Sequence, residues 1–173
     1  MKLKFGQNSK KESPTGWKEV PELIKNSNYN LILALIIGLV MMEIFDFIEP
    51  TFVTYGKIYL LIAIIPVHEA LHIICFRRPL KSEIWVDLKH FMFFVTNDEV
   101  FKKGRLSISL FMPFAILTLI PVIVSLTIWN NSYLNYFALY NALASGGDFL
   151  SLYVLFRAKG SYFKIVNNRL YAK

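Results

Sequence analysis

The sequence of 173 residues has one cysteine, Cys75, and therefore cannot form a disulfide within the chain. Charged residues are also scarce at 18%, whereas hydrophobic residues make up 55% of the chain, which is more apolar than an ordinary soluble domain. The apolar residues gather in long runs, an arrangement typical of membrane spans. We see no segment typical of a cleavable signal and no internal repeat, and the length suits one domain.

The net charge of +7 does not indicate a nucleic-acid partner. Basic residues cluster beside the apolar runs, as they do in the flanks of membrane helices. We therefore expect membrane lipid as a partner and expect no nucleic acid.

Four apolar runs are long enough to cross a bilayer as helices. They cover residues 29–48, 58–76, 106–129 and 134–156. The segments outside these runs are alternately rich and poor in Lys and Arg, beginning and ending with rich ones, which predicts a multi-pass protein of the cell membrane with both termini cytoplasmic. The expected parts are a polar cytoplasmic arm (1–28), a four-helix transmembrane domain (29–157) and a basic cytoplasmic tail (158–173).

The segment between the second and third runs, 82–105, is not a span. Within it, residues 84–95 alternate between apolar and polar side chains, which favours one or two short strands at the cytoplasmic face. A loop that rests its apolar residues on the membrane interface remains an alternative. The predicted fold is therefore an all-α membrane protein with four transmembrane helices and a short strand or hairpin segment.

The second run contains the motif HEALH, residues 68–72. On a helix, His68 and His72 share one face with their Cβ atoms about 5–6 Å apart, so both imidazoles can reach one zinc ion. Glu69 borders that face and is suited to take a proton from a water molecule that the metal activates. Hydrogen-bonded packing of two histidines is the alternative, but ionisable side chains are costly inside a bilayer. The motif thus predicts a zinc site.

A catalytic zinc ion needs a third protein ligand and an open position. The candidates are Asp148, Glu43, Asp46, His90, Asp87 and Cys75. Depth favours Asp148: it precedes Arg157 by nine residues, or about 14 Å of helix, while the centre of HEALH precedes Arg77 by seven residues, or about 10 Å. Cys75 and His90 remain alternatives.

The surroundings of Asp148 also fit a site. Gly146 and Gly147 would let its helix approach the second span and would weaken that helix, so that the carboxylate can turn toward the metal. Pro66 is expected to kink the second span. Asn141, two helical turns before Asp148, would either hold a substrate carbonyl or bridge two helices.

HEALH in an early span with SGGD in a late span resembles the bacterial zincin-type membrane peptidases, a family classed as a domain of unknown function. More distantly it is similar to the site-2 intramembrane metalloproteases. This resemblance covers the second to fourth runs. It implies that His68, His72 and Asp148 bind zinc, that Glu69 is the general base, and that Asn141 contacts substrate.

The predicted function is hydrolysis of peptide bonds, in a peptide or a membrane protein, by a zinc metallopeptidase with its site near the cytoplasmic side. Residues 84–95 could pair with an extended substrate as an added strand. The alternatives are a zinc-binding membrane protein without catalysis (an immunity factor, chaperone or sensor) and, less favoured, a transporter. Pairing into a homo-oligomer through small residues is open.

Overall fold

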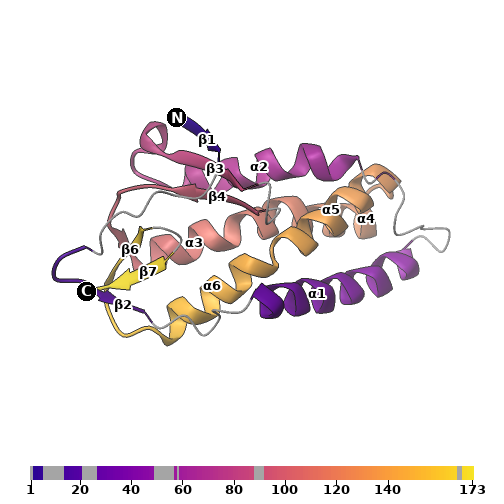
Figure 1. Cartoon of the computed structure of the whole chain (residues 1–173). Helices are drawn as coiled ribbons and strands as arrows, with labels where there is room; N and C mark the ends of the chain where they lie inside the picture. Colours follow the sequence, from indigo (N-terminus) through magenta and orange to yellow (C-terminus); the bar gives the residue numbers. More distant parts are fainter. Residues whose placement is uncertain are drawn as a thin grey trace.

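The computed structural model describes residues 2–5, 14–20, 27–48, 57, 59–87, 92–166 and 169–173. Its helices lie side by side, and its strands gather toward one end of them (Figure 1). The helices are α1 (Ser27–Ile48), α2 (Leu60–Ile74), a 3₁₀ turn η1 (Pro79–Lys81), α3 (Lys103–Phe114), a π-helical turn η2 (Ala115–Leu119), α4 (Ile120–Thr127), α5 (Ser132–Ala144) and α6 (Gly146–Arg157). Each of the four predicted spans thus contains helix.

The third predicted span is one continuous helix formed by α3, η2 and α4. It covers Lys103–Thr127, 25 residues with a mean hydropathy of 2.3 in its most apolar part. Within the described residues it is the one helix long and apolar enough to cross a membrane. This helix contains two prolines: the π turn begins two residues after Pro113, and Pro121 lies in the first turn of α4.

The fourth predicted span is broken rather than continuous. Helix α5 ends at Ala144 and α6 begins at Gly146, with Ser145 between them. The Ser145 hydroxyl donates a hydrogen bond to the carbonyl of Asn141 at 2.8 Å, which satisfies an acceptor in the last turn of α5. The break places Asp148 in the first turn of α6.

Two small sheets accompany the helices, so the chain is mostly helical rather than all-α. The first sheet has the order β1 (Lys2–Phe5), β3 (Glu83–Asp87), β4 (Met92–Thr96), with β1 parallel and β4 antiparallel to β3. The strand pair predicted in 84–95 is therefore present. The second sheet is antiparallel, with the order β2 (Lys18–Glu19), β7 (Arg169–Ala172), β6 (Tyr162–Val166), β5 (Phe101–Lys102).

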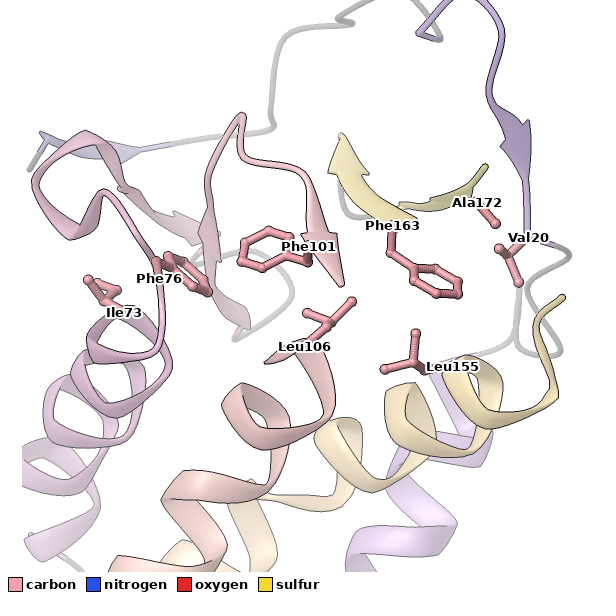
Figure 2. Packing of buried hydrophobic residues seen from close by; sticks show 8 residues of the cluster. All are labelled: Val20, Ile73, Phe76, Phe101, Leu106, Leu155, Phe163 and Ala172. Carbon is pink, nitrogen blue, oxygen red and sulfur yellow. The ribbon is translucent and has the colours of Figure 1, made fainter. Parts of the chain in front are cut away.

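A hydrophobic cluster joins the second sheet to the ends of α2, α3 and α6 (Figure 2). Its buried members are Val20, Ile73, Phe76, Phe101, Leu106, Leu155, Phe163 and Ala172. The rings of Phe76 and Phe101 lie 5.0 Å apart between centroids, within the range of favourable aromatic pairs. Strands β6 and β7, which lie within the predicted tail, thus contribute Phe163 and Ala172 to this cluster.

A second cluster packs α1, α2 and α5 together, with Phe45 and Ile64 fully buried in it. Helix α1 approaches α5 at Gly38, where an added Cβ would meet the end of the Leu143 side chain. A small residue at this position therefore lets Leu143 pack directly against α1.

We predict that Phe163→Ala lowers the free energy of unfolding by about 3–5 kcal/mol, because it empties a fully buried aromatic site under the second sheet. The matched control is Tyr162→Ala, since Tyr162 is the adjacent residue of β6 and is 46% exposed. Thermal unfolding of the detergent-solubilised protein checks this. Equal losses in the two variants would contradict the assigned packing.

Candidate metal centre

Helix α2 carries two histidines on its buried face. His68 and His72 are 5% and 8% exposed, whereas Val67 and Ile74 on the same helix are 44% and 68% exposed. The spacing of four residues, close to one helical turn, brings the imidazoles together, with ring centroids 4.9 Å apart. The HEALH motif therefore lies on a helix, and both histidines point inward, as predicted.

Asp148 of α6 completes a group of three side chains. Its Oδ2 lies 3.0 Å from Nε2 of His68, and its Oδ1 lies 3.3 Å from Nε2 of His72. The two Nε2 atoms are 3.2 Å apart. All three residues offer a ligand atom within 4.8 Å of the others, so they could hold one metal ion. The aspartate selected by its depth in the sequence is thus brought to both histidines.

The far nitrogen of each histidine is held by another helix. Nδ1 of His72 donates a hydrogen bond to the backbone carbonyl of Ser109 at 2.8 Å. Nδ1 of His68 lies 2.9 Å from Oδ1 of Asn141. A carbonyl oxygen can only accept, so both Nδ1 atoms carry a proton, and the Nε2 atoms of both rings face the Asp148 carboxylate. Ligating histidines are commonly oriented in this way.

The donor set fits a divalent cation. Two imidazole Nε2 atoms converge on the two carboxylate oxygens of Asp148, so a positive charge between them, either a metal ion or a proton on Nε2, stabilises the group. Ligand atoms about 2.0–2.1 Å from a tetrahedral ion are about 3.3 Å from each other. The Nε2–Nε2 distance of 3.2 Å and the Nε2–carboxylate distances of 3.0 and 3.3 Å match that spacing. Nitrogen and oxygen ligands are those that zinc accepts.

Glu69 lies directly beside the three candidate ligands. Its side chain is buried at 8% exposure and interacts electrostatically with both histidines and with Asp148. It is not a member of the three-residue group. A carboxylate that borders a metal site without occupying it is suited to exchange a proton with a molecule bound there.

The Asn141 side chain is fully buried and hydrogen-bonded at both ends. Its Oδ1 accepts from His68, and its Nδ2 donates to the Pro113 carbonyl at 3.1 Å and to Oγ1 of Thr118 at 2.9 Å. These partners fix the orientation of the amide, because the Pro113 carbonyl can only accept. A contact with substrate, expected from the sequence, stays a prediction.

The other ligand candidates do not join the group within the described residues. Glu43 and Asp46 are exposed on α1, and Cys75 is a half-buried free thiol just past the end of α2. His90 and the side chain of Asp87 lie outside the residues whose side chains the structure describes.

Three polar contacts of the site were missed by sequence reasoning: the carbonyls of Ser109 and Pro113 and the hydroxyl of Thr118. One signal was available for the first. Pro113 has no N–H, so the carbonyl four residues earlier, that of Ser109, loses its usual helical partner and is free to accept from a side chain.

Comparison with known proteins gives one match. A family model described as "Putative zincin peptidase" covers residues 61–163, from early in α2 to β6. No curated protein and no solved structure matches the chain. The matched region contains both histidines, Glu69, Asn141 and Asp148, and it spans more than half of the sequence. The chain therefore belongs to this family, whose description is "Putative zincin peptidase".

Proposed function

We propose that this protein is an integral-membrane zinc metallopeptidase that cleaves peptide bonds at the centre formed by His68, His72 and Asp148. The observation that carries the proposal is the convergence of two Nε2 atoms and one carboxylate at spacings of 3.0–3.3 Å. The family assignment supports the same reaction class. Three protein ligands leave the open position that hydrolytic zinc sites require.

A bound zinc ion would supply Lewis-acid chemistry, polarising the scissile carbonyl and making water more acidic. The carboxylate of Glu69 takes a proton from the attacking water as the new C–O bond forms. It then gives that proton to the amine nitrogen as the C–N bond breaks. The low exposure of Glu69, 8%, excludes competing water and strengthens its interaction with charge that develops beside it.

The membrane location is supported by where apolar side chains lie. The helix Lys103–Thr127 is about 37 Å long, more than the hydrocarbon core of a bilayer, and only 28% of its most apolar part is buried. Large apolar residues are also exposed along α1, namely Ile32, Leu35, Ile36, Leu39, Val40 and Phe47. Lipid covers such surfaces without cost, whereas a soluble monomer rarely exposes them. We propose that the chain crosses the membrane four times, at the four apolar runs identified in the sequence.

The orientation follows from the basic residues. The connection between α2 and α3 contains Arg77, Arg78 and Lys81, whereas residues 128–131 between α4 and α5 contain no basic residue. The ends of the chain lie near the strands in Figure 1, on the side of this basic connection. We therefore propose that the strand end of the helices is cytoplasmic and that both termini lie there.

The set of candidate ligands is similar to the one that the site-2 intramembrane metalloproteases use, the family to which the sequence shows a distant resemblance. There too, two histidines of one span are joined by an aspartate from a later one. This chain departs from their usual N-x-x-P…D-G context, because its glycines precede Asp148 and no proline follows Asn141. The departure concerns the surroundings of the aspartate and leaves the three ligand types in place.

An extended peptide is the substrate form that the first sheet accommodates. Strand β4 lies at the edge of the order β1-β3-β4 and packs beside α2, the helix that carries HEALH. Within the described residues, β4 pairs with β3 on one side, so its other edge can accept a further strand. Pairing there would hold a substrate backbone extended near the candidate metal centre.

We predict that the purified wild-type protein contains close to one zinc ion per chain and that His68→Ala and Asp148→Ala contain little. Each change removes a ligand from a three-ligand set, which the remaining two cannot replace. Metal analysis of detergent-purified protein measures this.

Cys75→Ser and Asp46→Ala are the matched controls, since they remove another potential ligand type or an exposed carboxylate outside the group. Both should keep the metal. Loss of zinc in Cys75→Ser, with zinc retained in Asp148→Ala, would show that the third ligand is the Cys75 thiol and would refute the assigned site.

We predict that Glu69→Gln keeps its zinc but loses about 10²–10⁴-fold in turnover, because the amide cannot carry the proton. Cleavage of a fluorogenic peptide pool in vesicles, followed by mass spectrometry, measures turnover. Wild-type activity in Glu69→Gln would rule out its role as a base. A biological effect that survives this change, with no peptide cleaved by the wild type, would favour a zinc-binding protein without catalysis.

We predict that proline at the β4 positions whose N–H points away from β3 lowers cleavage without changing zinc content or thermal stability, because that N–H would pair with substrate. At the intervening positions proline breaks the β3–β4 hairpin, so cleavage should fall together with the thermal midpoint. Cleavage of the same peptide pool and metal analysis together test this. Undiminished cleavage throughout the scan would exclude strand addition at β4.

A further inference from the structure

Both histidines of the candidate metal centre are oriented by the same helix. The carbonyl of Ser109 in α3 holds Nδ1 of His72, and the carbonyl of Pro113, at the end of α3, holds the amide of Asn141 that in turn holds His68. The two carbonyls are four residues apart and therefore lie about one helical turn apart on the same face of α3. The orientation of the site thus depends on carbonyls that bond side chains from α2 and α5.

The first carbonyl is released by the chemistry of proline. In a regular α-helix the Ser109 carbonyl would accept from the N–H of residue 113, and proline has none. His72 supplies the missing donor at 2.8 Å, and the Ser109 hydroxyl returns a hydrogen bond to the His72 carbonyl at 3.0 Å. This two-way contact fixes both the tautomer of His72 and the distance between α2 and α3.

The second carbonyl is used where the helix changes its winding. Pro113 is fully buried, and the π turn Ala115–Leu119 begins two residues later. Within that turn, Oγ1 of Thr118 accepts from Nδ2 of Asn141 and donates to the Ala138 carbonyl at 3.2 Å. Asn141 is therefore held with its oxygen toward His68. Wider π turns are found often at functional sites.

We propose that Pro113 is a positioning residue of the metal centre: it leaves the Ser109 carbonyl to His72 and uses its own carbonyl to hold Asn141 against His68. Asn141 is then a positioning residue as well, rather than one that binds substrate. This inference rests on the proposed metal centre. It assigns to a proline in a membrane helix a role in metal affinity in addition to its effect on helix shape.

Pro113→Ala tests the proposal, with Pro121→Ala as the matched control in the same helix, where the proline is also buried. Alanine at 113 restores an N–H that competes with His72 for the Ser109 carbonyl. We expect Pro113→Ala to bind zinc at least about 10-fold more weakly, within the range found for lost outer-shell contacts, while its thermal midpoint does not fall. Pro121→Ala should bind zinc as wild type does.

The measurements are competition of zinc against a chelator and the visible absorption spectrum of the Co²⁺-loaded protein, which reports ligand geometry. Nitrogen chemical shifts of the metal-free histidines add a direct readout of the tautomer, which should shift for His72 in Pro113→Ala only. Equal zinc affinity and equal spectra in wild type and Pro113→Ala would overturn the proposal.

Asn141→Leu and Asn141→Asp form a second pair. The leucine removes the acceptor for His68, so zinc affinity should fall about 10–100-fold; the aspartate keeps that acceptor and should retain more metal. Full zinc affinity in Asn141→Leu with lost cleavage would instead support a contact with substrate. If wild type itself binds no zinc, the proposed function fails. If wild type binds zinc and the Pro113 and Asn141 variants bind it equally tightly, the positioning role fails.

Discussion

The rest of the site depends on one convergence of polar groups: two imidazole Nε2 atoms 3.2 Å apart face the carboxylate of Asp148. Such a group needs a positive charge among its members, either a metal ion or a proton on Nε2. The surrounding fold maintains it by giving each Nδ1 a carbonyl-type acceptor, so that neither ring can turn away. The three residues could hold a metal ion, and the buried Glu69 lies beside them.

Irregularities in the helices place these groups. The break at Ser145 brings Asp148 into the first turn of α6, and the proline at 113 releases the carbonyl that His72 uses. The two sheets serve a different purpose. A hydrophobic cluster that includes Phe101 and Phe163 ties the second sheet to the ends of α2, α3 and α6, which fixes the relative positions of the helices that carry the site.

Much of the site could be predicted from the sequence because its determinants are local. The spacing of His68 and His72 sets them on one helical face whatever surrounds them, and an aspartate at matching depth in a later apolar run is an unusual residue to find there. The strand pair in 84–95 followed from local alternation in the same way. The second sheet was missed since β2 pairs with β7 about 150 residues later, a contact that no local pattern encodes. Bridging of helices by Asn141 was one of the two alternatives for this residue, but its partners could not be named, because they lie on α3 and in the π turn, far away in sequence.

Zinc X-ray absorption of the metal-loaded wild-type protein in detergent tests the central claim most directly. The account predicts a four-coordinate ion with two imidazole nitrogens and light oxygen ligands, all at about 2.0–2.2 Å. A sulfur ligand at about 2.3 Å, or a spectrum with fewer than two imidazoles, would contradict a centre formed by His68, His72 and Asp148.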